Sequence, residues 1–325
     1  MKIAILDDYQ NCVRTLDAFQ KLAGHEVTIV MDYLPDIDEL AARLQEAEAI
    51  VPLRERTHIG AALLEKLPRL RLISQTGTTP HIDLKACTDR GVIVSSSHKM
   101  SPSYATAELT WGLIISALRH IPFEAEALKQ GRWQSTLGLC LRGRTLGVFG
   151  YGKIGSLIAG YGKAFGMDVL VYGREGSLDR ARQDGVVIAS SKEELFERAD
   201  VLSLHIRLTP ETKGIVSAED LARMKPTSLL VNTSRAGLIA PGTLEAALKN
   251  GRPGLAAIDV FETEPLRDPN HPLLRAQNAV ATPHIGYVER DSYEMIYGDS
   301  FDQVLAFASG HPINVLNPDV LGAAS

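Results

Sequence analysis

Gly150-Tyr151-Gly152-Lys153-Ile154-Gly155 is the stretch that decides the fold of this chain. An apolar run at 145–149 predicts a buried strand before it, and apolar residues spaced i, i+3, i+4 and i+7 from Ile154 predict a helix after it. Glycines between a strand and a helix are typical of dinucleotide binding. Gly150 permits the sharp turn, Gly152 lets a pyrophosphate approach the backbone, and Gly155 lets helix and strand pack closely. The free N–H groups at the helix start, Lys153 and Ile154, favour phosphate charge. The flanking strand and helix argue against the alternative, an ordinary glycine turn.

The length and composition indicate an ordinary globular chain. Its 325 residues suggest about two domains, and 45% hydrophobic with 22% charged residues is enough apolar material for two cores. The formal net charge of −5 disfavours nucleic acid as a partner, because proteins that track phosphates are usually basic. No apolar run reaches the roughly 18 residues of a membrane helix, and the first residues predict a strand rather than a signal peptide.

The cysteines and histidines favour neither disulfides nor a metal centre. Cys12, Cys87 and Cys140 show no CxxC spacing, so we expect unpaired thiols in a reducing cytoplasm. The nine histidines include no HExxH motif and no i,i+4 pair. We therefore expect no metal site, although one assembled from distant residues stays open.

Strand and helix signals alternate twice along the chain, which predicts an α/β protein of two doubly wound parallel-sheet domains. The first alternation covers residues 1–98. The second follows a long apolar helix at 101–120 and contains seven predicted strands, with the glycine turn after the first of them. The tail is too short to be a domain and is expected to return to the first one. We therefore predict a discontinuous catalytic domain, 1–98 plus 289–325, around a dinucleotide-binding domain, 99–288.

Three stretches of the second half each place polar groups at the end of an apolar strand, where parallel sheets bind ligands. Arg235 has the bidentate fork that suits a carboxylate. His284 can exchange a proton near neutral pH, and Glu264 can orient and charge-stabilise that imidazole. Asp259 can accept a hydrogen bond from a nicotinamide amide. Each residue taken singly is more often a solvated or turn-capping group, but their joint placement after successive strands favours a catalytic site.

These stretches closely resemble those of the D-isomer-specific 2-hydroxyacid dehydrogenases, a family that includes phosphoglycerate dehydrogenases and hydroxypyruvate and glyoxylate reductases. The resemblance covers nearly the whole chain. The segments that carry it are Ile73–Thr78, Leu84–Val94, Ala107–Leu109, the glycine turn, Asn232–Gly237, Asp259–Pro265 and Thr282–Gly286. It implies a flavodoxin-like catalytic domain, a Rossmann NAD(P)-binding domain and a homodimer.

The resemblance also implies a reaction and residue roles. The enzyme would interconvert a small 2-oxo acid and a D-2-hydroxy acid, with Arg235 binding the substrate, His284 as acid/base and Glu264 as its dyad partner. Arg54 would lie near the substrate, and Thr76 and Gly77 would present backbone N–H groups to its carboxylate. Further cofactor-binding positions are Gly173, Arg174, Thr233, Ser234, Asp259 and Gly286.

One departure from the family pattern bears on the choice of cofactor. The strand that ends at Tyr172 is usually followed by an Asp, which would hold the adenosine ribose of NAD; here Gly173 and Arg174 follow. The missing acid and the nearby Arg180 and Arg182 favour NADP. NAD stays open, because Glu175 could take the ribose instead.

Two rival functions stay open on the same fold. A formate dehydrogenase pairs its histidine with an amide, and Glu264 disfavours that reading. A nucleotide-sensing corepressor-like adaptor retains similar catalytic residues, so the site itself does not exclude it.

Overall fold

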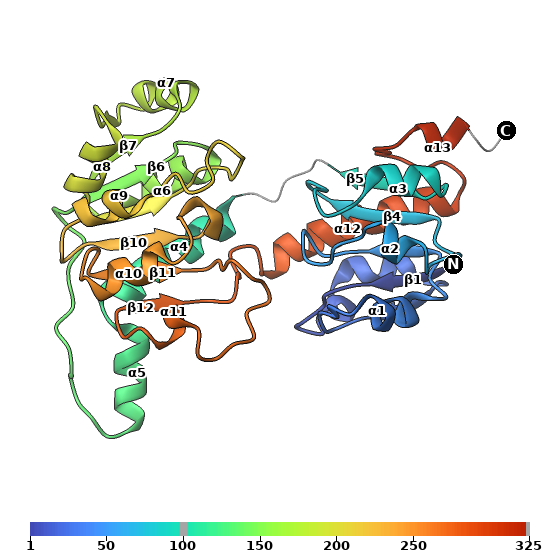
Figure 1. The fold of residues 1–325 in the computed structure, drawn as a ribbon, viewed down its shortest axis with the longest axis horizontal. Helices are drawn as coiled ribbons and strands as arrows, with labels where there is room; N and C mark the ends of the chain where they lie inside the picture. The colour runs from blue at the N-terminus through green and yellow to red at the C-terminus, as the bar shows by residue number, and fades with distance from the viewer. Residues whose placement is uncertain (98–102, 323–325) are drawn as a thin grey trace. The chain divides into compact units, whose positions relative to one another are not determined.

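The computed structural model describes residues 1–97 and 103–322, and the chain divides into two compact units (Figure 1). Met1–Pro102 with Glu289–Ser325 forms unit 1, and Ser103–Val288 forms unit 2. The predicted boundary after residue 98 falls at the stretch 98–102, outside the described residues. The second boundary lies between Val288 and Glu289.

Unit 1 is built on a five-stranded parallel sheet in the order β2-β1-β3-β4-β5, the flavodoxin-like order expected for the catalytic domain. Its strands are β1 Lys2–Ile5, β2 Glu26–Ile29, β3 Ala49–Val51, β4 Leu72–Thr76 and β5 Ile93–Ser97. Strands β3, β4 and β5 are fully buried, because helices cover both faces of the sheet. Because all five strands are parallel, the loops that follow them lie at the same edge of the sheet.

The helices of unit 1 come from both ends of the chain. They are η1 Val13–Thr15, η2 Asp17–Leu22, α1 Ile37–Leu44, α2 Ala61–Leu64, α3 Leu84–Asp89, α12 Arg290–Ala308 and α13 Asp319–Gly322. Helix α12 joins β4 through buried polar groups: Gln303 Nε2 donates to Ser74 Oγ and to the Gln75 carbonyl, each at 2.9 Å. The tail then returns to β5, where Val315 bridges Ser95.

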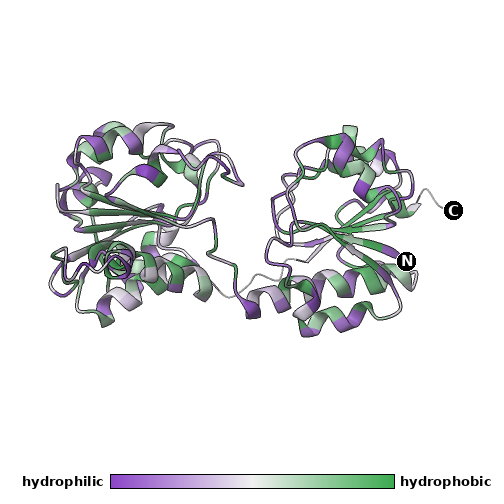
Figure 2. Cartoon of the chain, turned by 90° about the horizontal axis from the view of Figure 1, so that it is seen from below, coloured by the Kyte–Doolittle hydropathy of each residue, from purple (hydrophilic) through white to green (hydrophobic). Residues whose placement is uncertain are grey.

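Unit 2 carries a seven-stranded parallel sheet in the order β12-β11-β10-β9-β6-β7-β8, the doubly wound Rossmann arrangement that the seven predicted strands implied. The strands are β6 Thr145–Phe149, β7 Asp168–Tyr172, β8 Val187–Ile188, β9 Val201–Leu204, β10 Leu229–Asn232, β11 Leu255–Ile258 and β12 Ala279–Ala281. In Figure 2 the strands of both sheets are mainly apolar, between helices of mixed hydropathy.

The helices of unit 2 occupy both faces of its sheet (Figure 1). They are α4 Tyr104–Leu118, α5 Ile121–Lys129, α6 Lys153–Ala164, α7 Glu175–Gln183, α8 Lys192–Arg198, α9 Ala218–Arg223, η3 Ala236–Leu238, α10 Thr243–Lys249 and α11 Pro272–Arg275. The apolar α4 packs on α6, β10 and β11, with Trp111 and Ile114 buried in the core of its own unit. This packing buries most of the apolar side chains of the helix within unit 2.

A different set of apolar side chains is exposed on α5 and on residues 131–138, the segment that follows it. Trp133 is 77% exposed and Leu137 93% exposed, and Ile121, Phe123 and Leu128 on α5 are each close to half exposed. The segment packs back along the helix, because Ser135 N and Thr136 Oγ1 both donate to the Glu124 carboxylate. Large exposed apolar groups are typical of interaction surfaces.

Candidate active site and cofactor site

The turn between β6 and α6 has the shape of a phosphate cradle. Gly150 has a φ of +100°, and a Cβ there would lie 2.6 Å from the His205 carbonyl oxygen; a Cβ on Gly155 would lie 2.0 Å from the Gly150 carbonyl oxygen. Both positions therefore require glycine. A Cβ on Gly152 would meet nothing within 4 Å, so its backbone faces open space at the start of the 12-residue α6. The turn fits the pyrophosphate of a dinucleotide.

The residues after β7 lie beside this turn. A Cβ on Gly173 would approach Gly150 Cα to 3.4 Å and Ser177 Oγ to 2.9 Å. Arg174 follows as the exposed N-cap residue of α7. Glu175 forms an ion pair with Arg182, with 2.7 Å between Oε1 and Nη1. This pair engages the carboxylate that the sequence analysis considered as a ligand of the ribose. Arg180 donates to the Tyr151 carbonyl at 3.0 Å, inside the glycine turn.

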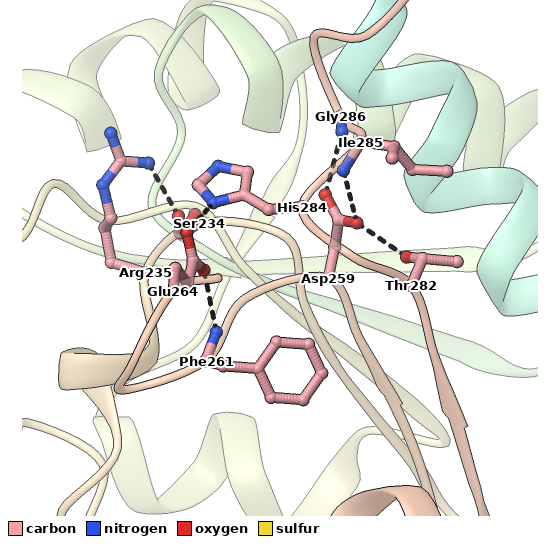
Figure 3. A network of polar contacts seen from close by, with 9 residues as sticks. All are labelled: Ser234, Arg235, Asp259, Phe261, Glu264, Thr282, His284, Ile285 and Gly286. Carbon is pink, nitrogen blue, oxygen red and sulfur yellow. Dashed lines mark hydrogen bonds and ion pairs between the residues drawn. The ribbon is translucent and has the colours of Figure 1, made fainter. Parts of the chain in front are cut away.

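His284 and Glu264, the two residues predicted to act as a dyad, are in direct contact (Figure 3). His284 Nδ1 lies 2.6 Å from Glu264 Oε2, and both side chains are 19% exposed. The second carboxylate oxygen of Glu264 accepts a 2.9 Å hydrogen bond from the Phe261 backbone N–H. The carboxylate is thus fixed on one side and meets the imidazole on the other, which leaves His284 Nε2 for a reacting group.

Asp259 holds the loop that carries the histidine. Its carboxylate accepts hydrogen bonds from Thr282 Oγ1 at 2.6 Å and from the backbone N–H groups of Ile285 at 2.8 Å and Gly286 at 2.9 Å. Burial raises the pKa of the Asp259 carboxyl, and these donors oppose that rise. The loop it holds is strained, because His284 has a left-handed φ of +53°.

Arg235 follows β10 in a loop fixed by Asn232. The Asn232 amide donates to the Arg235 carbonyl at 3.0 Å and accepts from the Ser234 N–H at 3.0 Å. Arg235 Nη1 donates to the Ser234 carbonyl at 2.8 Å, which orients the guanidinium (Figure 3). The carboxyl ends of β10, β11 and β12 thereby bring Arg235, Glu264 and His284 onto one edge of the unit 2 sheet.

Helix α4 supports this edge through two threonines that the sequence analysis did not single out. Thr110 Oγ1 lies 2.8 Å from Thr233 Oγ1, and Thr106 Oγ1 donates to the Gly286 carbonyl at 2.9 Å. The two threonines are four residues apart on a largely apolar helix, so they lie on the same face, and that spacing is the signal that marks them. Thr233 and Gly286 remain predicted cofactor positions, and each also has this structural contact.

The remaining predicted substrate residues belong to unit 1. Arg54 follows β3 with a φ of +55°, and its Nη1 lies 3.2 Å from where a Cβ on Gly77 would stand. Thr76 Oγ1 donates to the Ile296 carbonyl at 3.1 Å, so its side chain fastens β4 to α12. The Gly77 N–H donates to the Ser97 carbonyl at 2.9 Å, so in this structure that N–H is already engaged rather than presented to a carboxylate.

The described residues, 1–97 and 103–322, contain neither a cluster of metal-binding side chains nor a helix that could span a membrane. No group of three or more His, Cys, Asp or Glu side chains within them is arranged to hold a metal ion. None of their helices is long and apolar enough to cross a membrane.

Comparison with known proteins points to one family. The family model described as "D-isomer specific 2-hydroxyacid dehydrogenase, NAD binding domain" matches residues 111–286. A glyoxylate reductase from Aeropyrum pernix is 35% identical over 298 residues, which is 88% of each chain. A solved structure from Ralstonia solanacearum, provisionally described as a D-3-phosphoglycerate dehydrogenase oxidoreductase, is 52% identical, with a TM-score of 0.95 over 99% of this chain and 98% of that one.

Some relatives are much longer than this chain. The D-3-phosphoglycerate dehydrogenase of Methanocaldococcus jannaschii is 39% identical over 252 residues, which cover 77% of this chain and 47% of the relative. The chain therefore spans about half the length of that relative.

Proposed function

The chain belongs to the D-isomer specific 2-hydroxyacid dehydrogenase family, and from this premise we propose how its residues carry out the NAD(P)-dependent interconversion of a 2-oxo acid and a D-2-hydroxy acid. The 2.6 Å contact between His284 Nδ1 and Glu264 Oε2 is the observation that carries the proposal. A carboxylate that holds one ring nitrogen of a partly exposed histidine is the arrangement of a general acid/base.

Each residue of the site has one role in the reducing direction. The nicotinamide cofactor, when bound, supplies the hydride for C2 of the 2-oxo acid. Arg235 binds the substrate carboxylate through its guanidinium fork. His284 donates a proton from Nε2 to the oxygen on C2, and Glu264 stabilises the charged imidazole and fixes its orientation. Asp259 maintains the strained loop, and its proposed contact with the nicotinamide amide would be additional to the three hydrogen bonds that it accepts.

Unit 1 supplies the second set of contacts in this proposal. Arg54 binds the anionic end of the substrate beside the turn at Thr76 and Gly77, where the Gly77 N–H stays engaged with the Ser97 carbonyl. The approach of the Arg54 guanidinium to Gly77 supports this role, because it places a cation at the end of β4.

The cofactor proposed for this enzyme is NADP rather than NAD. Gly173 offers no carboxylate to repel a 2′-phosphate, Arg174 is exposed beside it, and Glu175 is paired with Arg182. A phosphate at this position would meet a guanidinium fork of suitable geometry.

Assembly and location complete the proposal. We propose a homodimer that is formed through unit 2, in line with the exposed apolar surface on α5 and residues 131–138. We also propose a cytoplasmic enzyme, because its three cysteines, Cys12, Cys87 and Cys140, are all free thiols.

Turnover of a panel of 2-oxo acids tests the proposed function. Glyoxylate, pyruvate, hydroxypyruvate and 3-phosphohydroxypyruvate would each be reduced with NADH and with NADPH, and the chirality of the product would be determined. We expect reduction of at least one acid to its D-hydroxy acid. Formate oxidation in place of reduction would favour the formate dehydrogenase alternative, and tight cofactor binding without turnover of any acid would favour the adaptor.

A further inference from the structure

Asp7 is a buried carboxylate at the carboxyl edge of the unit 1 sheet that the proposed chemistry does not use. It lies two residues beyond the end of β1, is 1% exposed and has a left-handed φ of +63°. Burial raises the pKa of the Asp7 carboxyl, because the charged form loses its hydration. Both the buried carboxylate and the strained backbone cost stability, and such costs gather at functional positions.

The contacts of Asp7 connect it to the loop that carries Arg54. Thr57 Oγ1 donates to Asp7 Oδ2 at 2.8 Å, and Tyr9 OH donates to Asp7 Oδ1 at 3.2 Å. Thr57 is itself only 4% exposed and lies three residues after Arg54. Because β1 and β3 are neighbours in the sheet, with Ile5 paired to Val51, the segments that follow them lie side by side.

A second hydrogen bond fastens the same loop to the turn after β4. Thr78 Oγ1 donates to Glu55 Oε1 at 2.6 Å. Directly before these two hydrogen-bonded residues the Arg54 backbone is left-handed, and the Arg54 Nη1 lies 3.2 Å from where a Cβ on Gly77 would stand. The loop is therefore held at Glu55 from the solvent side and at Thr57 from the buried side.

We propose that Asp7 is a positioning residue that acts through Thr57 to hold the Arg54–Thr57 loop, so that the Arg54 guanidinium stays at the Gly77 turn and meets the anionic group of the substrate. This inference rests on the proposed function for the identity of the substrate. It predicts that loss of the Asp7–Thr57 hydrogen bond weakens binding of the 2-oxo acid and leaves the cofactor site in unit 2 unaffected.

The variants Asp7→Asn and Thr57→Val test the proposal, and Asp8→Asn is the matched control. Asp8 is the next residue and is fully buried, but its carboxylate accepts from the Cys12 and Val13 backbone N–H groups at the start of η1. We expect Asp7→Asn and Thr57→Val each to raise KM for the 2-oxo acid by about tenfold. In both variants, kcat should change less than twofold, and so should the KM for the cofactor.

Further variants separate positioning from general destabilisation. Thr57→Ser keeps the hydroxyl and should have nearly the wild-type KM. The Asp7→Asn/Thr57→Val double variant should be no worse than Asp7→Asn alone, because Thr57 acts through its hydrogen bond to Asp7. Asp8→Asn should lower the thermal midpoint without raising KM for the acid. Equal KM changes in Asp7→Asn and Asp8→Asn, or additive effects in the double variant, would overturn the proposal.

Amide hydrogen exchange over residues 53–58 provides a readout that needs no substrate. We expect faster exchange of this segment in Asp7→Asn than in wild type or Asp8→Asn. If wild type reduces no 2-oxo acid but the exchange difference is present, the proposed function fails and the positioning role of Asp7 stands. Unchanged exchange in Asp7→Asn would refute that role whatever the enzyme turns over.

Discussion

At the residue scale, the proposed site depends on side chains whose position is fixed by a particular neighbour. Glu264 meets His284 at 2.6 Å, Asp259 holds the histidine loop, and Arg235 is oriented by the Ser234 carbonyl. The left-handed backbone of His284 is strained, and the three hydrogen bonds of Asp259 maintain it. The proposed chemistry therefore requires both the acid/base pair and Asp259, which keeps the histidine loop in place.

Arg235→Lys tests the carboxylate contact. Lysine keeps the charge but loses the planar fork that binds two carboxylate oxygens at once. We expect kcat/KM for the 2-oxo acid to fall by about 10- to 100-fold, the range for losing a hydrogen bond to a charged group. Cofactor affinity, measured by fluorescence titration, serves as the control and should not change. Wild-type kinetics in this variant would show that Arg235 has a structural role only.

The cofactor preference is tested by two substitutions at one position. Gly173→Ala and Gly173→Asp both introduce a Cβ near Ser177 Oγ, but only the aspartate adds charge. We expect wild type to have a higher kcat/KM with NADPH than with NADH. Gly173→Asp should lower the NADPH/NADH ratio by about tenfold or more relative to Gly173→Ala, because a carboxylate repels the 2′-phosphate. A tenfold preference of wild type for NADH would contradict our interpretation of Gly173 and Arg174.

At the element scale, the sequence predicted the strands better than it predicted the packing of the helices and the long-range hydrogen bonds. Apolar runs such as 201–204 and 229–232 are buried on both faces, so their pattern alone indicated parallel strands, and the glycine turn identified β6 and α6. The role of α4 was not predictable in the same way, because an apolar helix can be buried by its own sheet or by a partner. Likewise, the Asp7–Thr57 bond joins residues fifty positions apart, which no local pattern reveals.

Two histidines in the loops after β4 and β9, His81 and His205, make stability depend on pH. Burial lowers the pKa of His81 from 6.5 to about 4 and that of His205 to about 3. Below pH 6.5 the unfolded chain therefore binds protons that the folded chain does not, and stability falls as pH falls, by about 1.4 kcal/mol per pH unit for each histidine.

The variant His81→Gln tests this pH dependence by urea unfolding. Between pH 7 and pH 5 we expect it to lose about 2 kcal/mol less stability than wild type, because one of the two proton-binding groups is absent. Between pH 7 and pH 8.5 the difference between the two proteins should stay constant. Parallel stability curves over the acid range would contradict the role of His81.

At the scale of the whole molecule, the exposed apolar surface on α5 and residues 131–138 bears on assembly. Trp133 and Leu137 are the most exposed large apolar side chains among the described residues. We expect a homodimer by light scattering at micromolar concentration, and a monomer after Trp133→Glu/Leu137→Glu, since charges at the centre of an apolar interface are unfavourable. Leu321→Glu, at a half-exposed site on α13 in unit 1, is the control and should remain a dimer. A monomeric wild type would reject the assembly proposal.

The two units contain different parts of the proposed site. Unit 2 contains the glycine turn, Arg235 and the dyad, whereas unit 1 contains Arg54 and the turn at Gly77. Losses in kcat/KM for the 2-oxo acid should therefore follow changes to Arg54 in unit 1 or to Arg235 in unit 2, and losses in kcat should follow changes to the dyad. Kinetic parameters thus separate binding of the acid from the chemical step.

The kcat of His284→Asn tests the central claim most directly. Asparagine keeps a polar side chain of similar size near Glu264 but cannot donate a proton in the reaction. We predict that kcat for reduction of the preferred 2-oxo acid falls by about 10²–10⁴-fold, the range for losing a general acid, with cofactor affinity kept. A kcat within twofold of wild type across the pH range would contradict the assignment of His284 as the acid/base.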